Sequence, residues 1–152
     1  MNKIEIIPAI AGFLIALGIS YVTKEWTTPA PIQFYERHAS KTTVVGSDTV
    51  TIYWKEVRDR KCDSIVYRRL ISSDGAITNF EPEHEEAKPT GVEVEGKYSF
   101  ILPVGMSNGL LTYRVKTEFR CNAIQRLFGG HIFIMPDIVF NYSSNEYEEH
   151  VQ

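Results

Sequence analysis

The chain has 152 residues, of which 43% are hydrophobic and 23% are charged, and its formal net charge at pH 7 is −3. This length accommodates about one domain beside any targeting segment. The acidic balance gives no electrostatic support to a general nucleic-acid role, because affinity for the phosphate backbone depends on clustered lysine and arginine. The two cysteines and four scattered histidines lack the spacing of a metal cluster. We therefore expect no metal, no cofactor and no nucleic-acid partner.

An apolar stretch over residues 4–22 begins the chain, and its one charged residue is Glu5. A helix over this stretch would be roughly 28 Å long, close to the ~30 Å hydrocarbon core of a bilayer. The sequence therefore predicts one N-terminal transmembrane helix within residues 1–26. The residues expected to face lipid or the membrane interface are Phe13, Leu14, Ile15, Leu17, Tyr21 and Trp26.

Other interpretations of this stretch remain open. A cleaved signal peptide would be cut near the small residues Gly18 and Ser20, but Glu5 is atypical of a signal peptide's basic start. These features favour a retained membrane anchor over a cleaved signal peptide. A buried core helix is the weakest of the three interpretations. Gly12, Ala16 and Ser20 recur every four residues, a spacing that permits close helix contact in lipid. Small residues are common in any such helix, so self-association is a minor hypothesis.

Residues 27–31 contain two prolines and are expected to form a short, stiff linker to the domain at residues 32–142. In that domain apolar and polar residues alternate in short segments bounded by turn residues, which is typical of an all-β protein. Seven strands are predicted, over residues 32–37, 48–58, 64–72, 76–80, 92–102, 111–121, and an interrupted last strand over 131–135 and 138–142. The acidic tail, residues 143–152, is expected to be disordered.

The runs TVTIYWKEVR, SIVYRRLISSDG and GLLTYRVKTEF resemble strands B, C and F of fibronectin type III and immunoglobulin-like domains. Trp54 stands where the fibronectin domain keeps its core tryptophan, and Tyr113 begins strand F as a tyrosine-corner residue does. The resemblance covers residues 32–142 and implies a seven-stranded antiparallel sandwich with both residues in its core. It implies nothing about function. The layout of one anchor and one small domain is also similar to that of small membrane-anchored phage and bacterial proteins.

In such a sandwich, Cys62 lies in the B–C loop and Cys121 begins the F–G loop, and both loops emerge at the same end. An even number of cysteines in an exported domain favours a disulfide. Two free buried thiols are the alternative.

The same end gathers candidate interaction residues, because basic and apolar loop residues near a membrane are typical of contact with anionic headgroups or a protein partner. They are Arg58, Arg60, Lys61, Arg120, Arg126, Leu127 and Phe128. Alternatively, the two apolar residues pack under their loop and the basic residues are merely solvated. Arg68, Arg114 and Lys116 would form a further basic stripe if their strands are neighbours.

Residues 81–89 (EPEHEEAKP) are acidic but match no calcium loop, so a solvated loop is expected. The sequence contains no catalytic motif with supporting context, and we expect no enzyme. The sequence predicts a membrane-anchored, non-catalytic binding module whose C-terminal domain lies outside the cytoplasm, in a periplasmic or extracellular space. The alternatives are a phage virion or assembly component, and a secreted module released by signal cleavage.

Overall fold

The computed structural model describes residues 3–27 and 29–144, and, within its first helix, the side chains of residues 10–24. Two helices and ten strands lie in these ranges. In chain order they are α1 (Lys3–Thr27), β1 (Ile32–Ala39), β2 (Thr43–Val45), β3 (Thr49–Arg58), β4 (Asp63–Ile71), β5 (Ile77–Asn79), β6 (Glu83–Glu85), β7 (Glu93–Ile101), β8 (Gly109–Arg120), α2 (Ala123–Phe128), β9 (His131–Ile134) and β10 (Ile138–Ser143).

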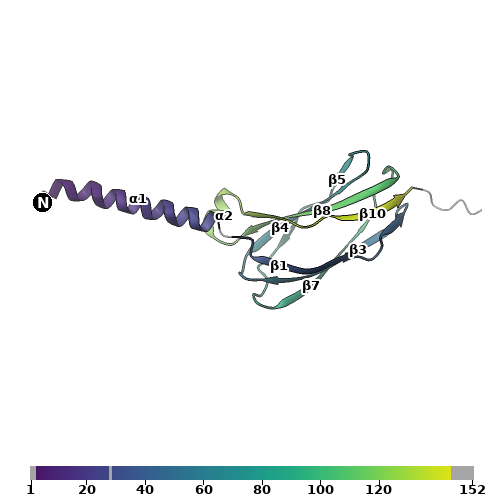
Figure 1. Ribbon diagram of the computed structural model, residues 1–152, viewed down its shortest axis with the longest axis horizontal. Helices are drawn as coiled ribbons and strands as arrows, with labels where there is room; N and C mark the ends of the chain where they lie inside the picture. The colour runs from purple at the N-terminus through teal and green to yellow at the C-terminus, as the bar shows by residue number, and fades with distance from the viewer. Residues whose placement is uncertain (1–2, 28, 145–152) are drawn as a thin grey trace, which may run out of the picture.

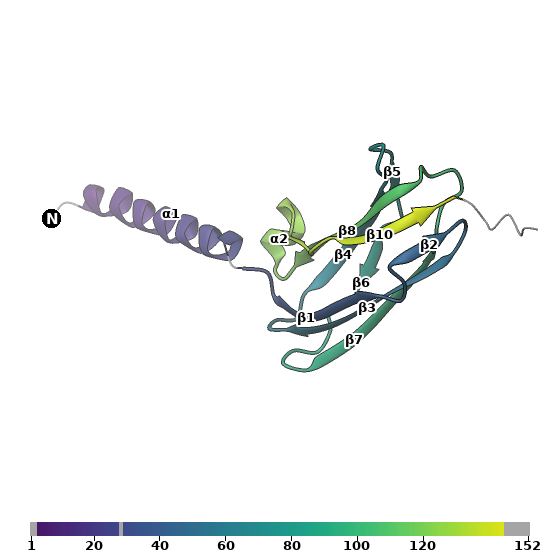
Figure 2. The ribbon, with the colours of Figure 1, turned by 45° about the vertical axis from the view of Figure 1, so that its right-hand side comes forward.

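The strands form two sheets that face each other (Figures 1 and 2). The smaller sheet has the antiparallel order β1-β3-β7. The larger sheet has the order β2-β10-β8-β4-β5, with β6 also paired to β4 and β9 also paired to β8. In this sheet β10 and β2 run parallel, and the other pairs are antiparallel.

The prediction of a predominantly β domain is confirmed, whereas the prediction of seven antiparallel strands is wrong. The sheets are mixed, and two three-residue strands, β2 and β6, were not expected. Strand β2 pairs in parallel with β10 from the far end of the domain, and local alternation carries no signal for such a distant pairing. The interrupted last strand corresponds to β9 and β10, which both pair with β8 and flank Pro136.

The hydrophobic core lies between the sheets, and β8 supplies its longest row of inward side chains. These are Leu111, Tyr113, Val115, Thr117 and Phe119, as the alternation predicts. From the smaller sheet, Val50 and Ile52 are buried and Trp54 is half-buried against the same core. The Trp54 indole lies against Gly96, its register partner on β7, where an added Cβ would lie 2.3 Å from Trp54 Cε2.

Helix α1 extends away from the sheets and has its C-terminal end beside α2 (Figure 1). Its described side chains, residues 10–24, are all exposed. Among the described residues, no helix offers an apolar segment of the length needed to cross a membrane. The side chain of Trp26 and the tail from residue 145 lie outside the described part of the chain.

Candidate functional site

The expected disulfide is present, with an S–S distance of 2.03 Å between Cys62 and Cys121. The register of β4 and β8 explains the pairing, because Asp63 lies opposite Arg120 and the two cysteines are the next residues outward. The bridge therefore fastens the ends of two central strands of the larger sheet. We call this region, together with α2, the disulfide end of the domain.

Helix α2 occupies the segment after Cys121 that was expected to be a loop. Asn122 caps it, since its Oδ1 accepts a hydrogen bond from Gln125 N at 2.9 Å. Gln125 is buried and its Oε1 accepts from the backbone N–H of Cys121 at 2.8 Å. An asparagine cap and the pair Gly129-Gly130 at the other end are signals that the sequence does contain.

Two apolar residues at the C-terminal end of α2 face outward, with Leu127 78% and Phe128 69% exposed. This arrangement differs from the alternative in which both residues pack beneath the loop. Because the helix is fixed by Asn122 and Gln125, it presents these side chains on an ordered element close to the end of α1.

The basic residues predicted to form a patch here are mostly engaged with neighbours. Arg126 Nη2 lies 2.9 Å from Asp63 Oδ2, and Arg120 Nε lies 2.8 Å from Glu118 Oε1. Arg60 donates to the carbonyl of Pro29 at 2.5 Å and so ties the linker to the domain. Lys61 is exposed. The disulfide end therefore has an apolar projection surrounded by basic residues, two of which are paired with acids.

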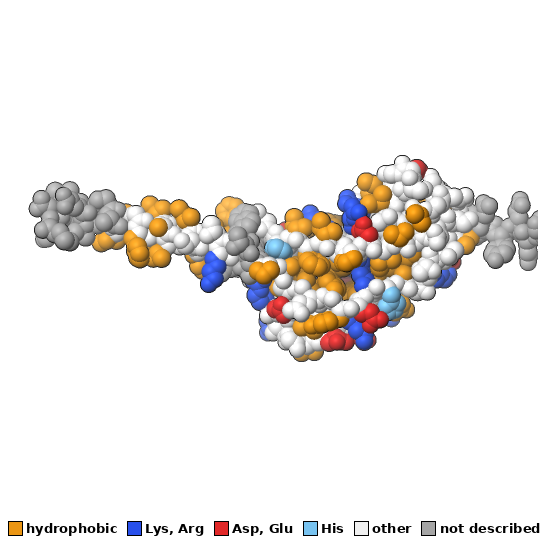
Figure 3. Space-filling model, viewed as in Figure 1, with side chains coloured by type: hydrophobic (Ala, Val, Ile, Leu, Met, Phe, Trp, Pro, Cys, Tyr) orange, Lys and Arg blue, Asp and Glu red, His pale blue; other side chains and the backbone are white. Residues whose placement is uncertain are grey.

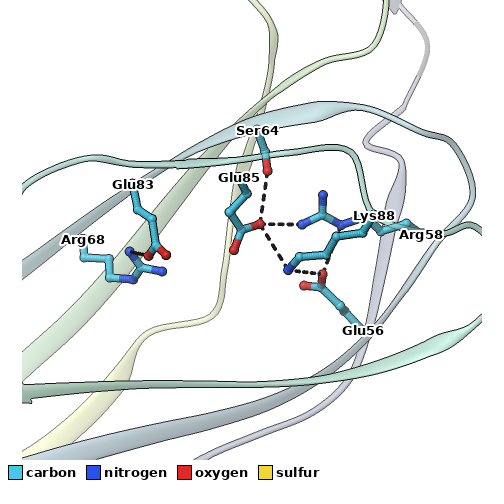
Figure 4. Close-up of polar contacts among 7 residues, drawn as sticks. All are labelled: Glu56, Arg58, Ser64, Arg68, Glu83, Glu85 and Lys88. Atoms are coloured by element: carbon cyan, nitrogen blue, oxygen red, sulfur yellow. Dashed lines mark hydrogen bonds and ion pairs between the residues drawn. The ribbon is translucent and has the colours of Figure 1, made fainter.

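Arg58 is not a loop residue at this surface but a buried one, with 1% of its surface exposed. The alternation of β3 continues inward past Trp54, so that Glu56 and Arg58 also face the interior. Arg58 Nε lies 3.0 Å from Glu56 Oε1, and its Nη2 lies 2.7 Å from Glu85 Oε2 (Figure 4). Lys88 Nζ completes the group at 3.1 Å from Glu56 and 3.2 Å from Glu85. We call these four residues the inner ion-pair cluster.

Most of the acidic segment is exposed, as expected of a solvated loop, but it contains the short strand β6, and Glu85 and Lys88 are half-buried. The Glu85 carboxylate also accepts a hydrogen bond from Ser64 Oγ at 3.2 Å. Burial raises the pKa of Glu85, but the charge of Lys88 and the hydrogen bond from Arg58 outweigh that effect and hold the pKa below its usual value. Glu85 is therefore ionised at neutral pH and binds β6 to the interior of the domain.

Arg68 is also an inward-facing residue, which contradicts the basic stripe considered with Arg114 and Lys116. In the register of β4 and β8, Arg68 lies opposite the buried Val115, whereas Arg114 and Lys116 point to the other face. Arg68 Nη1 lies 2.7 Å from Glu83 Oε2 (Figure 4), and its guanidinium lies 4.0 Å from the centroid of the Tyr98 ring.

A cavity of about 20 Å³ lies among these inward-facing charges. Ligand pockets for organic molecules are typically about 300–1,000 Å³, so this cavity does not accommodate one. Two buried polar atoms of its lining residues, Arg58 Nη1 and Thr117 Oγ1, have no hydrogen-bond partner among the described residues. Arg68 Nη1 makes no aligned hydrogen bond either, but it is ion-paired with Glu83. The described residues also contain no group of three or more side chains arranged to hold a metal ion.

Neither a protein-family model nor a curated protein sequence matches the chain. Solved structures do resemble it. A Niemann-Pick type C2 protein from the Japanese carpenter ant superposes with a TM-score of 0.52 at 10% identity, covering 78% of this chain and 98% of that one. The C-terminal domain of wzt gives a TM-score of 0.51 at 10% identity, with 77% and 76% covered.

The alkylpurine DNA glycosylase AlkC from Pseudomonas fluorescens, solved with DNA containing an abasic site analog, gives a TM-score of 0.51 at 8% identity. The match covers 76% of this chain and 31% of the glycosylase. At such identities the three likenesses show a shared β fold and nothing about activity. Membership of the fibronectin or immunoglobulin-like superfamily stays a prediction.

Proposed function

We propose that the protein is a non-catalytic binding module held at a membrane by α1, with its disulfide end next to the bilayer. The observation that carries this proposal is the exposed apolar surface of α1 (Figure 3). The large apolar residues described between Ile10 and Val22 are 41% to 65% exposed, and the face without them carries the small residues Gly12, Ala16 and Ser20. A helix that is apolar all round needs an apolar environment, and a bilayer supplies one on every side.

The disulfide end supports the same arrangement. Leu127 and Phe128 are exposed on α2, which contacts the C-terminal part of α1. Apolar side chains at this position would reach the interfacial region, while Lys61 and Lys24 stand where anionic headgroups would attract them. The proposal retains the C-terminal domain outside the cytoplasm and leaves the rest of its surface for a protein partner.

The test is the location and mass of the full-length protein expressed in an export-competent bacterial host. We expect it in the membrane fraction, resistant to alkaline extraction, with the mass of the complete chain minus two hydrogens for the disulfide. A product in the soluble fraction that begins after residue 20 would instead make it a secreted module. A membrane-independent, high-order oligomer would favour the assembly component.

Charge substitution sharpens the test. Leu14→Arg with Leu17→Arg should release the protein from the membrane, because each arginine costs about 2.5–3.5 kcal/mol at the centre of a membrane helix. Val104→Arg is the matched control, since Val104 is an exposed apolar residue of the β-domain. Membrane retention of the double variant, or release of the control, would contradict an anchoring role for α1.

A further inference from the structure

Strand β7 forms a long, regular edge of the smaller sheet. It pairs with β3 through nine consecutive register partners, from Glu93 to Ile101, and no bulge interrupts them. Figures 1 and 2 show no other helix or strand beyond it on that side of the domain. The other described edge strands are less suited to pairing, because β1 is bulged between Phe34 and Glu36 and β2, β5, β6 and β9 have three or four residues each. A long, regular edge strand is a template for pairing with another chain.

Every second residue of β7 directs its backbone groups away from β3. Leu102, just after the strand, donates its N–H to the carbonyl of Asp48 at 3.1 Å, so the even-numbered residues of β7 are the ones that bond to β3. The N–H and C=O groups of the other five residues point to the open edge and have no hydrogen-bond partner among the described residues. These residues are Glu93, Glu95, Lys97, Ser99 and Ile101. A further strand at this edge would satisfy them.

The charges on this edge complement a second copy of the same strand. Antiparallel pairing centred on Gly96 places Glu95 of each chain opposite Lys97 of the other. A centre at Glu95 or at Lys97 would instead bring like charges face to face. Within its own chain Glu95 contacts Lys55 at 3.0 Å, whereas Lys97 has no acid within ion-pair range among the described residues. The partner's Glu95 would supply that acid.

The inward-facing residues support the same pairing independently. It places Val94 opposite Tyr98 of the partner, and an aromatic residue opposite a β-branched one is a favourable cross-strand pair. Both residues are half-buried in the single chain. Val92, which is 55% exposed just before β7, is placed opposite Phe100 of the partner. At the centre two copies of Gly96 meet, so no side chain obstructs the close approach of the backbones.

We propose that β7 is a homophilic interface at which two copies of the chain join their smaller sheets into one continuous antiparallel sheet. Such a pair has two-fold symmetry, the commonest symmetry of homo-oligomers. The Glu93 end of β7 lies at the disulfide end of the domain, because Glu93 is opposite Val57 and Arg58 is opposite Ile32. Antiparallel pairing therefore puts the two α1 helices at opposite ends of the pair. If α1 enters a membrane, as proposed above, the interface joins chains from two facing bilayers.

The first test uses the full-length protein in detergent, where association at β7 does not require a bilayer. We expect a concentration-dependent dimer in sedimentation equilibrium. Lys97→Glu and Glu95→Lys should each raise the dimer dissociation constant about tenfold, because each brings like charges together at two positions. An equimolar mixture of the two variants should dimerise as the wild type does, because both cross-strand pairs then join opposite charges. Lys116→Glu, on the outward face of β8 in the larger sheet, is the matched control and should leave dimerisation unchanged.

Three results would overturn the β7 interface. They are a protein that stays monomeric at every concentration, a mixture of the two variants that does not recover dimerisation, and a dimer that neither charge reversal weakens. The last of these would place self-association at α1 instead.

Vesicles test the consequence for membranes, which rests on the proposed function. Vesicles that carry the full-length protein should aggregate, and vesicles with Lys97→Glu should adhere only to those with Glu95→Lys. If the protein dimerises in detergent but does not insert into vesicles, the attachment by α1 is wrong and the β7 interface stands. Inserted, dimerising protein that leaves the vesicles dispersed would overturn the connection between facing bilayers.

Discussion

Arg58 lies on the inward face of β3, and its guanidinium is shared between Glu56 and Glu85. Arg58→Met keeps much of the side-chain volume but leaves the buried Glu56 and the half-buried Glu85 with Lys88 as their remaining cation in the inner ion-pair cluster. Loss of one partner from a buried ion pair costs about 3–5 kcal/mol. We therefore expect the free energy of unfolding, measured in urea, to fall by about 3 kcal/mol.

The matched control is Arg126→Met, which breaks the exposed pair with Asp63. Exposed ion pairs contribute about 0–1 kcal/mol, so this variant should unfold at nearly the wild-type urea concentration. Losses of similar size in the two variants would show that Arg58 is no more important to stability than a surface arginine.

Glu85 makes stability depend on pH in a predictable direction. Its pKa is lower in the folded protein than in the unfolded chain, because Lys88 and Arg58 outweigh the effect of burial. Its stabilising contribution is therefore complete above the unfolded pKa, near 4.5, and is lost as the pH falls through the lower folded value. The melting temperature should be steady from pH 7 to about 5 and should decrease below that range.

Glu85→Gln should lower the melting temperature at pH 7 and reduce its decrease in acid. Some acid dependence will remain, because hydrogen bonds from Ser107 and Ser72 lower the pKa of Asp74 to about 2. Glu86→Gln, at the exposed next position, provides the control and should follow the wild-type pH profile. An unchanged acid slope in Glu85→Gln would mean that the inner ion-pair cluster does not contribute to acid unfolding.

At the scale of elements, the contact between β3 and β7 depends on the absence of a side chain at Gly96. An added Cβ would lie 2.3 Å from the Trp54 ring, so Gly96→Ala should destabilise the domain by about 1–3 kcal/mol through overpacking. Trp54→Ala removes the ring and should cost less than the loss of a fully buried tryptophan, because Trp54 is half-buried.

A double-mutant cycle measures this contact directly. If Gly96→Ala acts by a clash with the indole, it should cost much less in the Trp54→Ala background than in the wild type. Lys97→Ala, the exposed neighbour on β7, should be additive with Trp54→Ala. Additive effects for Gly96 as well would rule out the indole as the cause of its destabilisation.

The disulfide fastens β4 to β8 at the end of the domain nearest α1. It closes a loop with a sequence separation of 59, which on the chain-entropy estimate contributes about 4 kcal/mol. Reduction should therefore lower the melting temperature of the wild-type domain. Cys62→Ala with Cys121→Ala should show the lower value in both the presence and the absence of reductant. A wild-type melting temperature that reductant does not alter would indicate that the bridge contributes little.

The strands with strict alternation were predictable from sequence, and β8 shows why. Its five inward residues recur at every second position, and all of them are buried. On β3 the same alternation continues into Glu56 and Arg58. Such charges are almost always exposed, so Arg58, at the end of the predicted strand, was grouped with the surface residues of the following loop. Their burial depends on Glu85 and Lys88, which are distant in the chain, and no local pattern reports such a pairing.

At the scale of the whole molecule, α1 and the β-domain meet at a small contact. Helix α1 touches α2 near its C-terminal end (Figure 2). Arg60 holds the linker through a hydrogen bond to the carbonyl of Pro29. The two sheets bury their own core without using any of the described side chains of α1, residues 10–24. The stability of the domain and its attachment should therefore be separable properties.

Removal of residues 1–28 tests this separation. The remaining chain should unfold with a free energy within about 1 kcal/mol of the full-length value, because its core and disulfide are intact. It should also leave the membrane fraction entirely. Leu127→Ser with Phe128→Ser in the full-length chain is the companion variant, since it alters α2 without removing the helix that α2 contacts. If truncation destabilises the domain by several kcal/mol and the α2 variant does so too, then α1 is a structural part of the domain and not only its attachment.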